Sequence, residues 1–431
     1  MDPPQPTRQV RPLSLTLRAP DLADLAVCLL LALSMSVRSG YSVGALVLLA
    51  IGLSRWPALL RRKLYVPRAM VQWAVVIVLM ALTWSMHILE DGHLITSTLG
   101  LDRVTKYWLL LLLLPALLIR APATWALFWG SVAGAVGAGL TALWQTEGLG
   151  WPRAQGYTNE IQFGNLSLLL GLWCGIWGLH MPRGWWRAGA GLGALMGLYA
   201  SIASGTRGGW VVLPLCLFLV LCLSLPRPKR GAWKPMARAL GLTLVLCLPL
   251  AFVSPVQERM HKAVAQLFDT SRAGEGTPVG IRLAQWGFAW HLGMAHPWWG
   301  SGQMGYEAAQ RTAVARNEVP QDMRKLNHAH NEWLDMFAKR GLVGVIALLI
   351  FFGVPWRWFW KALKINAPPD GTPDAQRAAA LCGLVTVLGF VGFGMTQVMF
   401  AHNNGNLMYL LSVSVWLAAC HVGVRHNRDA D

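Results

Sequence analysis

Two histidines open the stretch where residues able to do chemistry are most concentrated, residues 327–344. His328 and His330 come just before Asn331, a residue type that favours the capping position at a helix N-terminus. The positive end of the helix dipole disfavours an imidazolium, so His330 is expected to be neutral and able to accept a proton. The alternative is a surface histidine that simply precedes a helix.

The helix that Asn331 begins is expected to run through about Lys339. Asp335 and Lys339 are then four residues apart on one helical face and should form an ion pair. Gly341 is expected to end this helix, and the apolar run that follows is expected to enter a membrane.

An arginine between glycines marks a second candidate site. Arg207 lies in the short polar stretch 203–210 and is expected to begin a helix. Backbone N–H groups near glycines, the electropositive helix N-terminus and a bidentate guanidinium all favour an anion, although Arg207 could instead reach toward lipid headgroups. Arg282 is a further candidate, on a helix that Thr277 is expected to cap with Pro278 in its first turn.

Two other polar loops lie between apolar runs. Residues 145–160 contain Arg153, Tyr157 and Asn159, which are candidates for binding sugar or phosphate. Asn159 could equally be a helix cap among polar groups in the lipid headgroup layer. Residues 400–406 are rich in amides, and for them contact with carbohydrate and contact with headgroups both remain open.

The elements that must position these residues are membrane helices. Of the 431 residues, 55% are hydrophobic and 13% are charged, and nearly uncharged runs of membrane-spanning length recur along the chain. We expect an all-α integral membrane protein with about twelve transmembrane helices. The expected spans are 21–37, 40–55, 70–89, 104–120, 123–144, 161–180, 186–203, 208–225, 237–254, 341–360, 378–398 and 405–424.

The net charge of +17 indicates orientation better than it indicates nucleic-acid binding. Most of the 37 Lys and Arg residues fall in loops on one side of the expected spans, as the positive-inside rule requires of cytoplasmic loops. Both termini are therefore expected to be cytoplasmic. Residues 255–340 then face the opposite side, together with the candidate histidines and arginines.

Three regions follow from this topology: residues 1–254 with about nine spans, an external lobe over 255–340, and residues 341–431 with about three spans. In the lobe, apolar residues at helical spacing over 256–267 predict an amphipathic helix near the membrane surface. The polar segment 306–326 is expected to be mobile. The seven cysteines all lie within expected spans, so no disulfide framework is expected.

The types of residue gathered on one side suit displacement of a diphosphate from a sugar. Arg207 and Arg282 can hold the diphosphate and stabilise its charge as the bond breaks, and a neutral His330 can take a proton from the attacking hydroxyl. No paired acids of the glycoside-hydrolase kind and no clustered carboxylates for a metal are evident, so neither metal nor cofactor is expected. A transporter of anionic substrates could use the same arginines.

Four motifs resemble the bacterial O-antigen ligase family, which shares a domain with O-antigen polymerases. The family pattern His-[Asn/Ser/Gln]-x9-Gly-x-x-Gly is similar to residues 330–344. The Pro-x-x-Gly-x-Gly run at 297–302, the Arg-Gly-x-Trp run at 207–210 and the Asn-x-x-x-Phe-Gly run at 159–164 also resemble the family. The resemblance covers roughly residues 150–400.

This resemblance implies a metal-independent, inverting glycosyltransferase of the GT-C type. Such an enzyme would move O-antigen polysaccharide from undecaprenyl diphosphate to lipid A–core oligosaccharide at the periplasmic face of the bacterial inner membrane, in lipopolysaccharide biosynthesis. His330 would be the catalytic base, Arg207 and Arg282 would bind the diphosphate, and His328 and Asn331 would support them. The alternatives are an O-antigen polymerase, an O-linked protein oligosaccharyltransferase and, from another class, a lipid or solute transporter.

Overall fold

The computed structural model describes residues 21–61, 65–90, 93–94, 100–118, 120–225, 233–268, 277–365 and 374–421. Residues 1–20 and 422–431 lie outside the described part, and so does the predicted location of both termini. The α-helices within it are α1 Leu22–Ala32, α2 Tyr41–Leu60, α3 Arg68–Ser85, α4 Leu101–Leu113, α5 Thr124–Leu143, α6 Glu160–His180, α7 Trp185–Ser204, α8 Arg207–Ser224, α9 Trp233–Cys247, α10 Ser254–Phe268, α11 Pro278–Ala295, α12 Gly302–Ala315, α13 Glu332–Ile365, α14 Ala375–Phe393 and α15 Asn403–His421.

Helices account for nearly all of this architecture, as the sequence predicted. The strands in the described residues are β1 Leu89–Glu90 and β2 His93–Leu94, which form one short antiparallel pair. Among the described residues, eight helical segments are long and apolar enough to cross a membrane, so the chain is a multi-pass membrane protein. Each of the twelve expected spans overlaps a helix, but some of these helices are short, such as the 11-residue α1. The total of twelve crossings stays a prediction.

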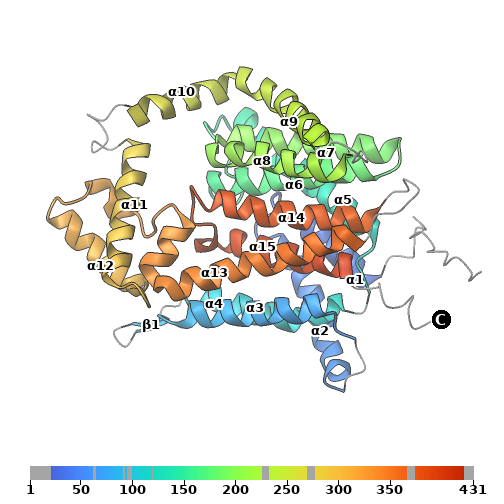
Figure 1. Cartoon of the computed structure of the whole chain (residues 1–431), viewed down its shortest axis with the longest axis horizontal. Helices are drawn as coiled ribbons and strands as arrows, with labels where there is room; N and C mark the ends of the chain where they lie inside the picture. The colour runs from blue at the N-terminus through green and yellow to red at the C-terminus, as the bar shows by residue number, and fades with distance from the viewer. Residues whose placement is uncertain are drawn as a thin grey trace, which may run out of the picture.

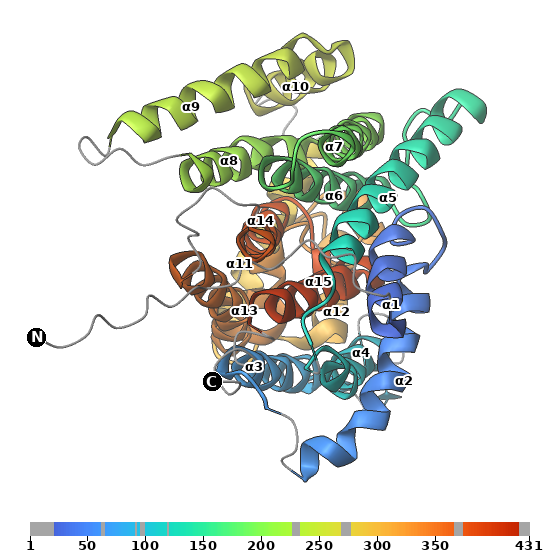
Figure 2. The same cartoon turned by 90° about the vertical axis from the view of Figure 1, so that its right-hand side faces the viewer.

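Helices α3, α6, α13 and α14 run roughly side by side along one direction (Figure 1). Seen from one end, α14 and α15 lie inside the bundle with α6 beside them, and α9 lies at its outer edge (Figure 2). Polar side chains inside the bundle pair with one another: Trp173 donates to Thr386 at 3.1 Å, and Trp73 donates to Ser414 at 2.9 Å. These bonds join α6 to α14 and α3 to α15.

Helices α10, α11 and α12 gather at one end of the bundle (Figure 1). A small apolar core of Ala289, Tyr306, Ala329 and Ala338 joins α11, α12 and the start of α13. The expectation of a mobile segment over 306–326 is wrong, because α12 and a 3₁₀ turn at Gln321–Lys325 occupy most of it. Tyr306 is fully buried there and lies beneath the Lys339 ammonium, 4.7 Å from its ring centroid.

The break at Gly341 divides α13 into two helices, as the sequence predicted. Gly341 has φ 62° and ψ −159°, a conformation that is essentially restricted to glycine. A Cβ atom on Gly341 would lie 2.3 Å from the Trp298 carbonyl carbon, and one on Gly300 would lie 2.2 Å from the Arg340 nitrogen. The two backbones therefore touch through glycines, and the N–H of Leu342 donates to the Pro297 carbonyl at 2.7 Å. This contact holds the lobe against the membrane helices.

Candidate active site

Asn331 caps the first half of α13 as predicted. Its side-chain oxygen accepts hydrogen bonds from the N–H groups of Trp333 at 3.0 Å and Leu334 at 3.2 Å. Its amide also donates to the Met395 carbonyl at 3.2 Å. The cap therefore joins residues 327–331, the histidine loop, to residues 394–398, the segment that follows α14.

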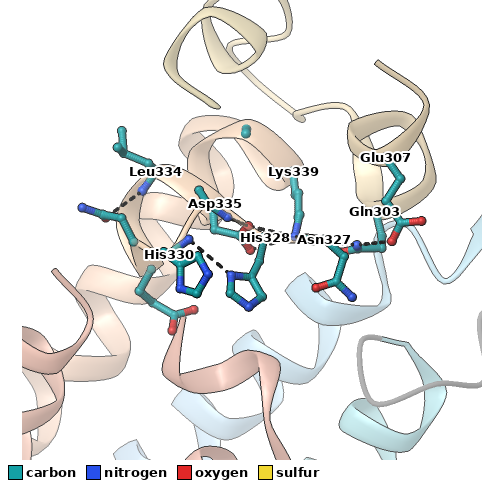
Figure 3. Close-up of polar contacts among 12 residues, drawn as sticks. Gln303, Glu307, Asn327, His328, His330, Leu334, Asp335 and Lys339 are labelled. Carbon is teal, nitrogen blue, oxygen red and sulfur yellow. Dashed lines mark hydrogen bonds and ion pairs between the residues drawn. The ribbon is translucent and has the colours of Figure 1, made fainter. Parts of the chain in front are cut away.

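An ion pair beside residues 327–331 fixes the backbone of this loop (Figure 3). The Lys339 ammonium lies 2.8 Å from the Asp335 carboxylate, which confirms the predicted pair, and Lys339 is only 1% exposed. Lys339 also donates to the Asn327 carbonyl at 2.9 Å, and Asp335 accepts from the Ala329 N–H at 3.0 Å. Each charged partner therefore holds one end of the 327–329 stretch.

The two histidines lie side by side in this loop (Figure 3). Their ring centroids are 4.3 Å apart, and the backbone N–H of His330 donates to Nδ1 of His328 at 3.2 Å. His330 has φ 50°, a left-handed conformation that is uncommon for residues other than glycine and that recurs at functional sites. The His402 ring centroid lies 6.1 Å from that of His328.

Both histidines are held neutral by their surroundings. Burial is the main cause that lowers the pKa of His330, and the Arg282 guanidinium lowers it further. Burial also lowers the pKa of His328 well below its usual value, with the neighbouring His330 as the next cause. The direction for His330 matches the prediction, but burial and Arg282 are the causes in place of the helix dipole.

Four arginines surround a cavity of about 280 Å³ between α8, α10, α11 and the loop before α6. Three of them, Arg153, Arg207 and Arg282, were candidates from the sequence, and the fold brings them together. The fourth, Arg259, was missed because the pattern of α10 in the sequence lies in its apolar positions. Arg207 donates to the Arg259 carbonyl at 3.2 Å. The cavity therefore concentrates positive charge at the start of α8.

This cavity adjoins the histidine loop through the segment after α14. Thr396 lines the cavity, and the next residue, Gln397, is 2% exposed. The side-chain oxygen of Gln397 lies 2.7 Å from Nδ1 of His330. Gln397 was also missed, because it stands at the end of an apolar run and no motif marks it.

The three candidates of the 145–160 loop lie in different surroundings. Asn159 caps α6 by accepting from the Gln162 N–H at 2.9 Å, and its amide lies 3.4 Å from Nε2 of His402. Tyr157 is 49% exposed and does not line the arginine cavity. Arg153 donates to the Ser204 carbonyl at 2.7 Å, which ties this loop to the end of α7.

Two more features bear on chemistry. Within the described part of the chain, no group of three His, Cys, Asp or Glu side chains is arranged to hold a metal ion. A separate cavity of about 310 Å³ lies between α1, α2 and the segment after α4, lined by Asp24 and Arg120 among others. It contains none of the residues singled out from the sequence, so the arginine cavity is the better candidate.

Comparison with known proteins agrees with the motifs. An uncharacterized protein of Haemophilus influenzae is 25% identical over 278 residues, which is 63% of this chain and 67% of that protein. An O-antigen ligase of Escherichia coli K12 is 23% identical over 211 residues, which is 47% of this chain but only 44% of the relative. Residues 192–349, which include Arg207, Arg282 and His330, match the family model described as O-antigen ligase.

Proposed function

We propose that this protein is a glycosyltransferase that moves O-antigen polysaccharide from undecaprenyl diphosphate to lipid A–core oligosaccharide. The reaction takes place at the periplasmic face of the inner membrane, with both termini in the cytoplasm and residues 255–340 as a periplasmic lobe. The observation that carries the proposal is the arginine cavity beside a neutral histidine. Residues 1–254 and 341–431 supply the membrane helices in a GT-C-type arrangement.

The arginine cavity suits the diphosphate of the donor. Guanidinium groups bind phosphate oxygens in pairs of parallel hydrogen bonds, and these bonds strengthen as negative charge collects on the leaving group. Arg207 and Arg282 are the primary ligands in this proposal, with Arg153 and Arg259 beside them. Since their charges lie close together, a diphosphate relieves their mutual repulsion.

The acceptor step uses His330 as the general base. The acceptor hydroxyl gives its proton to His330 while its oxygen attacks the anomeric carbon from the face opposite the diphosphate. The bond between that carbon and the diphosphate oxygen breaks, the electron pair leaves with the diphosphate, and the configuration inverts. The arginines supply the positive charge for the leaving group, so no metal ion takes part.

A transporter is the less favoured reading of the same residues. Transporters place their binding groups near the bilayer midplane on interrupted helices. Here Arg207 stands at the first residue of α8. Arg282 lies on α11, at the end of the bundle where α11 and α12 gather, and His330 lies two residues before α13. A polymerase or a protein oligosaccharyltransferase would use the same cavity and differ in its acceptor.

The test is transfer by the purified protein in lipid nanodiscs. It is supplied with a glycan on undecaprenyl diphosphate and with rough lipopolysaccharide, in EDTA. We expect a ladder of glycosylated lipopolysaccharide, an inverted anomeric linkage and no stimulation by Mg²⁺ or Mn²⁺. Chain growth on the lipid-linked donor alone would indicate a polymerase, and no transfer to either acceptor would contradict the proposal. Activity that EDTA abolishes and Mg²⁺ restores would refute metal independence alone.

A further inference from the structure

The hydrogen bond between His330 and Gln397 determines which ring nitrogen of His330 carries the proton. Gln397 presents its side-chain oxygen to Nδ1 of His330 at 2.7 Å. An amide oxygen can only accept, so Nδ1 must carry hydrogen. In a neutral imidazole the other nitrogen, Nε2, then keeps its lone pair and is the atom able to take a proton.

The neighbouring His328 has the opposite arrangement. Its Nδ1 accepts from the backbone N–H of His330 at 3.2 Å, so this nitrogen carries no hydrogen. A neutral His328 therefore has its proton on Nε2 and can donate from there but cannot accept. Of these two adjacent imidazoles, only His330 offers an Nε2 that is free to act as a base.

We propose that Gln397 is a positioning residue that fixes His330 in the Nδ1–H tautomer, while the fold fixes His328 in the Nε2–H tautomer. This proposal rests on the proposed function, in which His330 is the base. It also assigns His328 a role that the sequence left open: a donor that can orient a hydroxyl oxygen.

The location of Gln397 supports a positioning role. Its side chain is 2% exposed, and its N–H donates to the Phe393 carbonyl at 3.0 Å, so it is anchored to the last turn of α14. The next residue toward α14, Thr396, lines the arginine cavity. One short segment therefore contacts both the base and the cavity proposed for the leaving group.

A neutral amide orients the imidazole without adding charge. The charged groups that act on His330 are Arg282 from α11 and Asp335 from α13. His330 in turn lowers the pKa of the neighbouring His328 and of His402. A carboxylate in place of Gln397 would add a negative charge 2.7 Å from Nδ1 and favour the imidazolium. A glutamine also accepts the hydrogen bond from Nδ1, but it leaves His330 as a neutral imidazole at neutral pH.

The kinetic test compares Gln397→Leu and Gln397→Glu. In metal sites, the groups that orient a ligating histidine contribute about 10–100-fold. We expect a loss of similar size in kcat for Gln397→Leu, with donor KM unchanged. Gln397→Glu keeps the acceptor, so it should recover activity at high pH with its pH profile displaced upward. The control is Gln310→Leu, which removes another buried glutamine, on α12, and should leave both parameters unchanged.

A spectroscopic test separates this proposal from the proposed function. Protein labelled with ¹⁵N-histidine should show a protonated Nδ1 and an unprotonated Nε2 for His330, assigned by their loss in His330→Gln. His328 should show the reverse pattern, and Gln397→Leu should mix the tautomers of His330. An Nε2–H tautomer of His330, or a normal kcat in Gln397→Leu while His330→Ala is inactive, would overturn the role of Gln397 and leave the proposed function intact. Normal turnover in His330→Ala would instead refute the base itself.

Discussion

His330 lies in surroundings that oppose its protonation yet leave it in contact with polar groups. Burial and Arg282 both lower its pKa, so it remains an unprotonated imidazole at neutral pH. A residue in a left-handed conformation, capped on one side and clamped on the other, is held by its neighbours against a strain of about 1–3 kcal/mol. Such strain is consistent with a catalytic position.

Removal of the His330 imidazole should therefore cost catalysis and not folding. We expect His330→Ala to lower the transfer rate by about 10²–10⁴-fold, the usual contribution of a general base, with donor binding retained. His328→Ala should cost less.

Since the pKa of His330 is lowered, activity in the wild-type protein should stay level from pH 8 down past about 6.5, the ordinary histidine value, and fall only at lower pH. Transfer kinetics across this range check both expectations. A dead His328→Ala beside an active His330→Ala would reverse the assignment.

The arginine cavity should distinguish geometry from charge. Arg207→Lys and Arg282→Lys keep the charge but lose the planar pair of donors, so each should lose most of its activity. Arg259→Lys should weaken donor binding less, because Arg259 stands beside the primary ligands in our proposal. Arg311→Lys is the matched control, since Arg311 is 64% exposed in the lobe and outside the cavity. Donor affinity and transfer rate are measured for each. Full activity in both lysine variants at 207 and 282 would leave only a general electrostatic role.

Motifs identify functional residues that have distinctive neighbours in the sequence. Arg207 stands between glycines and His330 precedes a cap, so both were found from the sequence. Arg259 acquires its position only through tertiary packing of α10 against α8 and α11, and Gln397 through its contact with His330. Nothing within a few residues of either distinguishes it from an ordinary polar residue.

At the scale of elements, glycines explain why the histidine motif extends so far. Gly300 and Gly341 allow two backbones to touch, and the contact fixes where the lobe meets the second half of α13. The clamp residues Asp335 and Lys339 lie in the short helix between the histidines and this contact. The residues from His330 to Gly341 therefore form one structural unit, which is held by the ion pair at one end and by the glycine contact at the other.

Gly341→Ala should disrupt that unit. The glycine-only conformation adds about 1–3 kcal/mol of strain for alanine, and the new Cβ would lie 2.3 Å from the Trp298 carbonyl carbon. We expect a markedly lower thermal unfolding midpoint and loss of transfer. Gly353→Ala is the matched control within α13, because its Cβ would meet nothing within 4 Å, and it should be neutral or slightly stabilising. Equal midpoints for the two variants would contradict this account of the kink.

Apolar runs of membrane-spanning length predicted most elements, and caps predicted others, including the start of α11 at Thr277 and Pro278. The failure at 306–326 has a physical cause. The segment has few apolar residues, and its helix is stabilised by long-range contacts of Tyr306 with Phe288 and Lys339. Such contacts have no counterpart in local periodicity. The same limit applies to the cavity, whose lining residues come from five separate segments.

At the scale of the whole molecule, the basic loops and the arginine cavity should lie on opposite sides of the membrane. The stretch Lys234–Phe252 is apolar and long enough to cross, and it separates Arg230 from Glu275 in the sequence. Positive-inside asymmetry puts Arg230 in the cytoplasm, so Glu275 should be periplasmic.

Reporter fusions test this topology directly. A phosphatase fused after Glu275 should be active and one after Arg230 inactive, with the reverse pattern for a fluorescent protein that matures only in the cytoplasm. A fusion after Asn317, in the turn that follows α12, should match Glu275, because both belong to the 255–340 lobe. Since Arg282 and His330 share that lobe, matching signals at Arg230 and Glu275 would remove the periplasmic location of the cavity, and with it the lipid-linked donor as the substrate we propose.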